Sequence, residues 1–157
     1  MGCGTGLTGE ALYEKGYRKI VGCDASKGIM RVAEGKCDSK AYTETKEIWL
    51  GKPETFPDEF KDRFDVITAT GILAQGHLDC KVFDEMIMAC KKDKGGIIVF
   101  TTRDMYLKDY GYQTRMDELE AEGKWKKLDE ITFDRYFNLN DEVLGRWKKV
   151  DIKCFAY

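Results

Sequence analysis

Met1-Gly2-Cys3-Gly4-Thr5-Gly6 opens the chain, and this stretch decides the fold. Three glycines at alternate positions let the backbone turn sharply, because glycine adopts positive φ freely and has no Cβ to keep a ligand away. Such a loop ordinarily follows a strand and leads into a helix whose first N–H groups can hold a nucleotide-like ligand. We expect that helix from about Thr8 to Lys15, with Gly16 as its stop. The pattern predicts a ligand-binding loop at the edge of a sheet.

Length and composition predict one globular domain over residues 1–157. The chain has 43% hydrophobic residues and a formal net charge of −2, with 26 basic residues almost balanced by 28 acidic ones. This balance gives no strong signal for nucleic-acid binding. No apolar run reaches the length of about 20 residues that spans a bilayer, and the N-terminus has no signal-peptide pattern. We therefore expect a cytoplasmic protein that does not enter a membrane.

The six cysteines are scattered without a C-x-x-C pair. This spacing argues against a zinc site and against a disulfide framework, and it predicts reduced thiols.

Apolar periodicity alternates between strand-like and helix-like segments, which is typical of an α/β domain with a mostly parallel sheet. The last two strand patterns have no helix between them and predict a C-terminal antiparallel β-hairpin. The expected strands are 20–24, a weaker 47–50, 64–71, 97–102, 131–139 and 150–157, and the expected helices after the first are one capped by Ser26, one over 82–90 and a long one over 107–122.

Two ligand classes fit the opening loop. Gly4-x-Gly6-x-x-Gly9 matches the dinucleotide fingerprint, with Asp24 about 20 residues on to hold a ribose. The overlapping Gly2-Cys3-Gly4-Thr5-Gly6 fits the G-x-G-x-G loop that holds S-adenosylmethionine in methyltransferases. The loop by itself does not separate a dinucleotide oxidoreductase from a methyltransferase.

Motifs further along the chain resemble the class I S-adenosylmethionine-dependent methyltransferases. They are Asp24 at the end of the strand expected at 20–24, Phe64-Asp65-Val66-Ile67 in the strand expected at 64–71, and Lys94-Gly95-Gly96 before the strand expected at 97–102. The family's usual proline is absent from this last turn. The resemblance implies a Rossmann-like sheet with an antiparallel strand inserted near its end, and it favours the methyltransferase reading. The chain also resembles the methyltransferase-like branch found in the Williams–Beuren syndrome region, through residues 2–12, Gly76-His77, Thr101-Thr102-Arg103 and Leu119-Glu120-x-x-Gly123-x-Trp125.

The resemblance implies S-adenosyl-L-methionine as the cofactor and assigns its contacts. The glycine loop would pass under the methionine half, Asp24 would accept hydrogen bonds from the ribose hydroxyls, and Thr70 would lie near the transferred methyl group. With Lys52 where relatives carry an acid, the adenine would depend on backbone and apolar contacts. The cofactor-binding candidates are Gly2, Cys3, Gly4, Gly6, Asp24, Ala25, Ser26, Leu50, Gly51, Thr70 and Gly71.

Two residues are candidates for work on the acceptor. His77, the only histidine, follows the strand expected at 64–71 and could serve as a general base, or it could be a surface histidine. Arg103 stands at the end of the strand expected at 97–102 and could orient an anionic substrate or form an ordinary salt bridge.

The family's first strand, which carries an acid before the glycine loop, has no counterpart in this sequence. We expect a partner chain or a missing N-terminal segment to complete the sheet. Two functions stay open: methyl transfer to a small-molecule or protein acceptor, and a catalytically inactive methyltransferase-like subunit with a structural role.

Overall fold

The computed structural model describes residues 1–36, 40–93, 95–135 and 150–157, which form two sheets and five α-helices. Strands β1 (Val21–Asp24) and β2 (Glu44–Glu47) pair in parallel. The second sheet has the order β3-β4-β6-β5. Its strands are β3 (Val66–Leu73), β4 (Ile97–Arg103), β5 (Asp129–Asp134) and β6 (Asp151–Ala156).

The α/β class is confirmed, and so is the antiparallel pairing of the last two strands. β3 and β4 are parallel, whereas β6 runs antiparallel to both β4 and β5 and lies between them. The predicted strand positions 136–139, and Lys94 of the predicted turn, lie outside the described residues.

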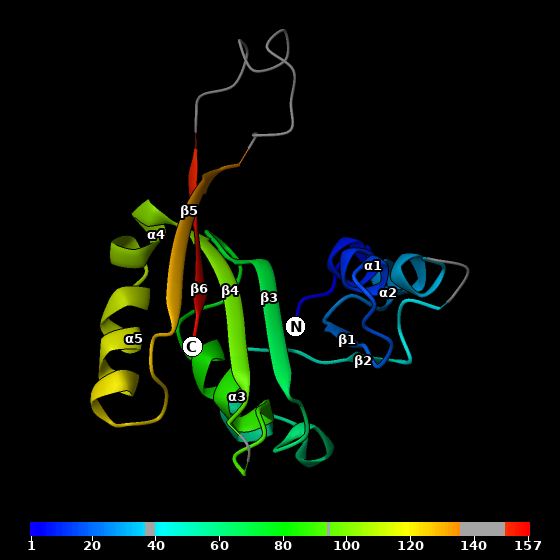
Figure 1. Ribbon diagram of the computed structural model, residues 1–157, viewed down its shortest axis with the longest axis horizontal. Coiled ribbons are helices and arrows are strands. Elements are labelled where there is room, and N and C mark those ends of the chain that lie inside the picture. Colours follow the sequence, from blue (N-terminus) through cyan, green and yellow to red (C-terminus); the bar gives the residue numbers. More distant parts are fainter. Residues whose placement is uncertain (37–39, 94, 136–149) are drawn as a thin grey trace, which may run out of the picture.

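One expectation about the sheet needs correction, because the strands form two sheets rather than one mostly parallel sheet. Residues 1–3 lie between the two sheets and contact both. The Met1 amino group donates to the Thr68 carbonyl of β3 at 2.7 Å, and the Cys3 N–H donates to the Cys23 carbonyl of β1 at 2.9 Å. Figure 1 shows the N-terminus between β3 and the β1–β2 pair.

The helices pack in two groups. α1 (Leu7–Glu14) and α2 (Lys27–Glu34) lie with β1 and β2, whereas α4 (Asp104–Asp109) and α5 (Tyr112–Ala121) lie along one side of the four-stranded sheet (Figure 1). α3 (Val82–Ala89) buries its side chains in the main core. Two short 3₁₀ turns, Pro53–Thr55 and Asp58–Phe60, connect β2 to β3. None of the helices in the described ranges has the length and hydropathy needed to cross a membrane.

Local sequence signals placed two helix ends correctly. The Ser26 hydroxyl accepts the Ile29 N–H and caps α2. Gly16, at φ 97°, follows α1, as its predicted role as a stop requires.

Two predicted elements differ from the structure. The weak strand expected at 47–50 lies at Glu44–Glu47 instead, where polar side chains pair beside β1. The long helix expected over 107–122 is two helices, because Gly111 adopts φ 68° between α4 and α5. A left-handed residue cannot continue a right-handed helix, and glycine takes that conformation without steric cost.

Aromatic rings join the helices to the four-stranded sheet. Phe100 on β4 lies 5.1 Å from Phe83 of α3 and 5.3 Å from Phe155 of β6, measured between ring centroids. Trp125 stacks on Tyr157 at 4.1 Å and donates its ring N–H to the Met116 carbonyl of α5. Phe100 is fully buried at the centre of this cluster.

We expect Phe100→Ala to lower the free energy of unfolding by about 3–5 kcal/mol, because it removes buried ring contacts and leaves a cavity. Leu128→Ala is the control, since Leu128 is 61% exposed and its loss should change stability by about 0.5 kcal/mol or less. Urea denaturation of the three proteins measures both values. Equal losses in the two variants would contradict a core centred on Phe100.

Candidate functional site

The glycine loop adopts the conformation that its sequence predicts. Gly2, Gly4 and Gly6 have φ values of 63°, 52° and 89°, a region that side chains with a Cβ rarely enter. The Gly6 N–H closes the turn on the Cys3 carbonyl at 2.9 Å. A Cβ at Gly6 would lie 2.8 Å from the Ala33 Cα of α2. The loop therefore depends on glycine for its shape and for its close packing on α2.

Asp24 ends β1 and holds the glycine loop. Its carboxylate accepts the Gly4 N–H at 2.9 Å through Oδ2 and the Ser26 N–H at 3.0 Å through Oδ1. An ionised carboxylate offers about four acceptor positions. No other side-chain hydrogen bond to this half-buried group is found among the described residues, which leaves two positions for a ligand.

Thr70 and Gly71 lie near the end of β3, beside the first helix. The Thr70 hydroxyl is 2.7 Å from the Thr8 hydroxyl of α1, and the Gly71 N–H donates to the Thr101 hydroxyl at 3.3 Å. The pairing of β3 with β4 is irregular between Ala69 and Leu73. Thr70 and Gly71 are both exposed, so they face the surface near the glycine loop.

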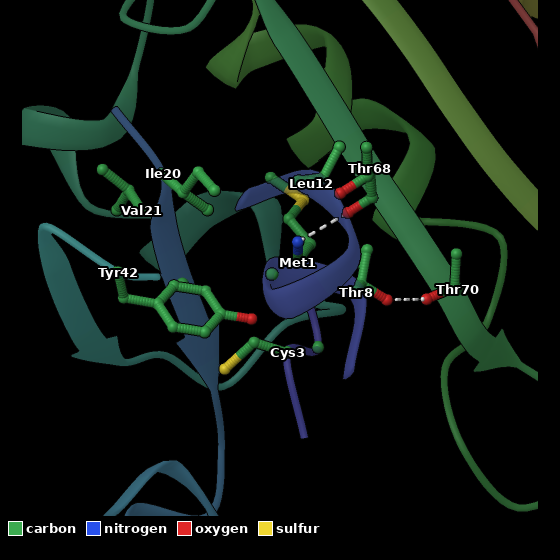
Figure 2. Close-up of a pocket in the computed structure, with 12 residues that line it drawn as sticks. Met1, Cys3, Thr8, Leu12, Ile20, Val21, Tyr42, Thr68 and Thr70 are labelled. Carbon is green, nitrogen blue, oxygen red and sulfur yellow. Dashed lines mark hydrogen bonds between the residues drawn. The ribbon is translucent and has the colours of Figure 1, made fainter. Parts of the chain in front are cut away.

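A cavity of about 30 Å³ lies beneath the loop, between α1, β1 and β3 (Figure 2). Nucleotide-sized ligands need pockets roughly ten times larger or more. A cofactor would therefore lie on the open surface above the strand ends, with the cavity below it. The lining residues are Met1, Gly2, Cys3, Thr8, Gly9, Leu12, Ile20, Val21, Gly22, Tyr42, Thr68 and Thr70.

The Cys3 thiol and the Tyr42 hydroxyl, both at this cavity, are poor bases and nucleophiles at neutral pH. Burial raises the pKa of the Cys3 thiol to about 11, and the Asp24 charge adds to the rise. Burial also raises the pKa of Tyr42 to about 12. Both groups stay protonated, and a protonated thiol is not the reactive form. Their geometry suits packing under the loop rather than covalent chemistry.

The loop after β2 reaches the same site from the other side. The Ile48 N–H donates to the Asp24 carbonyl at 3.0 Å, which places Trp49 and Leu50 just beyond the end of β1. Leu50 and Gly51 are half-buried and Trp49 is exposed, and the adenine contacts of Leu50 and Gly51 stay predictions.

Glu85 of α3 holds this loop, and its role was not foreseen from the sequence. Its carboxylate accepts the N–H groups of Gly51 and Lys52. A signal was available, because Glu85 shares the buried face of α3 at helical spacing with Val82, Met86 and Ala89. An acid on an apolar face needs hydrogen-bond partners.

The two acceptor-side candidates stand apart from this cluster. His77 is exposed in the turn after β3, where its backbone N–H donates to the Ala74 carbonyl at 3.0 Å. The Arg103 guanidinium lies 5.4 Å from the centre of the Tyr106 ring. Within the described ranges neither side chain hydrogen-bonds to Asp24 or to the glycine loop, so their roles stay predictions. Ala25 is half-buried, and its predicted place beside the adenosine stays a prediction.

Solved structures share this fold over nearly the whole chain. An S-adenosylmethionine-dependent methyltransferase from Mesorhizobium loti is 16% identical, with a TM-score of 0.61, and the match covers 99% of this chain and 87% of that one. A protein from Listeria monocytogenes assigned to the same class is 14% identical with a TM-score of 0.67, covering 99% and 87%. One from Bacillus halodurans assigned as a methyltransferase is 14% identical with a TM-score of 0.66, covering 99% and 88%.

Sequence comparison gives two further results. None of the curated proteins matches the chain. The family model described as "Methyltransferase domain" matches residues 1–141, which include the glycine loop, Asp24 and the strands β1 to β5. The chain therefore belongs to the methyltransferase domain family.

Proposed function

We propose that this chain binds S-adenosyl-L-methionine and takes part in methyl transfer to an acceptor. The observation that carries the proposal is the contact between the Asp24 carboxylate and the Gly4 N–H at the end of β1. Membership of the methyltransferase domain family supports it and favours methyl transfer over dinucleotide chemistry. Two of the structural neighbours are described as S-adenosylmethionine-dependent.

The residues at the strand ends fit this cofactor. Gly2, Cys3, Gly4 and Gly6 offer bare backbone for its methionine half, and the free acceptor positions of Asp24 suit two adjacent ribose hydroxyls. Ala25 and Ser26 would flank the adenosine, and Leu50 and Gly51 would contact the adenine. Thr70 and Gly71, exposed beside Thr8, would lie near the methyl group.

The chemistry asks for alignment more than for acid or base strength. A bound S-adenosylmethionine would supply a methyl group on a positively charged sulfur, with the neutral thioether S-adenosylhomocysteine as the leaving group. The residues at the strand ends would hold the cofactor in line with the acceptor, and such alignment would provide much of the acceleration. An acceptor that must lose a proton also needs a base. His77 is the candidate for that base and Arg103 for orienting an anionic acceptor, and the acceptor is a small molecule or a protein.

Two finer statements are proposals from the sequence. The likeness to the Williams–Beuren region branch rests on the glycine loop and on short motifs after β3, in β4 and at the end of α5. A cytoplasmic location is the other proposal from the sequence.

We also propose that an extended strand, from a partner chain or from residues outside this sequence, pairs with β1 and β3. The two strands belong to separate sheets, and residues 1–3 contact both of them, at Thr68 of β3 and at Cys23 of β1. Unpaired strand edges are ready acceptors for such a strand.

For the cofactor, we expect the protein to bind S-adenosylhomocysteine with a dissociation constant near the micromolar scale, measured by titration calorimetry. Asp24→Asn should weaken binding about tenfold or more, because it removes charge-assisted hydrogen bonds to the ribose. Asp109→Asn, at an exposed carboxylate on α4, is the control and should bind like the parent. Lack of binding by the parent protein would overturn the proposed function, and unchanged binding by Asp24→Asn would overturn the role of Asp24.

For the strand edges, we expect the β1 and β3 amides that point toward residues 1–3 to exchange with solvent faster than the amides of β4. β4 pairs on both sides, with β3 and β6, and paired amides are protected. Hydrogen-exchange NMR on the isolated chain measures the rates. Equal protection of the amides of β1, β3 and β4 would contradict unpaired edges on β1 and β3.

A further inference from the structure

Glu85 is a charged residue in a position where packing would favour an apolar one. It is 0% exposed and lies on α3 among Val82, Met86 and Ala89 in the main core. Burying a carboxylate is costly unless hydrogen bonds replace those it made with water. Its partners in the fold therefore show what the group can do.

Those partners are two backbone N–H groups of one loop. Glu85 Oε2 accepts the Gly51 N–H at 2.7 Å and Oε1 accepts the Lys52 N–H at 3.0 Å. Gly51 has φ 94°, a conformation in which its N–H and that of Lys52 both point to the one carboxylate. The carboxyl group thus holds a loop by its backbone, with no salt bridge among the described residues.

The same loop is held at its other end by β1. The Ile48 N–H donates to the Asp24 carbonyl, so residues 49–50 lie between two fixed points, Asp24 and Glu85. Trp49 is 71% exposed in this short span, and Leu50 is half-buried. Releasing the Glu85 end would leave the span attached at one side only.

Two opposing effects act on the Glu85 carboxyl. Burial raises its pKa, and the nearby Asp79 and Glu54 charges add to the rise, whereas the two N–H donors lower it. The hydrogen bonds from the loop therefore offset part of the cost of burying the group. The loop and the carboxyl group stabilise each other.

We propose that Glu85 is a positioning residue for the cofactor: it fixes the Gly51–Lys52 backbone and so holds residues 49–51 beside Asp24. The inference rests on the proposed function, in which Leu50 and Gly51 contact the adenine. Glu85 lies under the loop and does not touch the ligand. It supplies order to a loop that has Lys52 in place of an acid able to contact the adenine.

The test is titration of S-adenosylhomocysteine into the parent protein, Glu85→Gln and Glu85→Met. Glutamine has nearly the same size, but its NH₂ group faces an N–H that needs an acceptor, so one loop hydrogen bond is lost. We expect about tenfold weaker binding and faster exchange of the Gly51 and Lys52 amides. Asp84→Asn is the matched control, because Asp84 is the neighbour of Glu85 on α3 and pairs with Arg115 instead of the loop.

Glu85→Met separates positioning from stability. An apolar side chain of similar size relieves the cost of burying the carboxylate but removes both hydrogen bonds to the loop, so these effects oppose each other and the resistance to urea should change little while the dissociation constant rises. The inference would be overturned if either variant bound with parental affinity although its loop amides exchanged faster. The proposed function would then still stand. No binding by the parent protein would overturn the proposed function and the inference with it. Weaker binding in both variants, with Asp84→Asn unchanged, supports the role of Glu85.

Discussion

The carboxylate of Asp24 accepts two backbone N–H groups, and the arrangement of the site depends on these two bonds. Gly4 brings the glycine loop to the end of β1, and Ser26 brings the start of α2 to the same point. The carbonyl of Asp24 also accepts the Ile48 N–H and so fixes the chain beyond β2. One residue thereby connects three segments that the sequence places far apart.

The site is built mainly from backbone, with carboxylates as its supports. Asp24 supports the glycine loop, and Glu85 supports the loop after β2, in each case through N–H groups rather than through lysine or arginine. A neutral donor can be buried at lower cost than a cationic side chain. Neither support therefore uses a lysine or arginine side chain beside a site proposed for a cofactor that itself carries a positive sulfur.

Signals that act within a few residues predicted the structure well, and signals that depend on distant partners did not. The Ser26 cap and the glycine loop follow from local chemistry, and both form as expected. The position of β2 does not, because its polar residues become a strand by pairing with β1. Glu85 is a similar case: its helical spacing is visible in the sequence, but its partners, Gly51 and Lys52, are known only from the fold.

The placement of β6 between β4 and β5 has a consequence for biosynthesis. A ribosome makes β4 and β5 first, and until β6 follows, β5 has no neighbour in the sheet and β4 has only β3. The backbone N–H and carbonyl of Ile98 also lack their partner until Tyr157 is made, because they form two hydrogen bonds with it. Such distant pairing slows folding and leaves strand edges exposed in the growing chain. The strand edges of the nascent protein are therefore open to aggregation until β6 has been made.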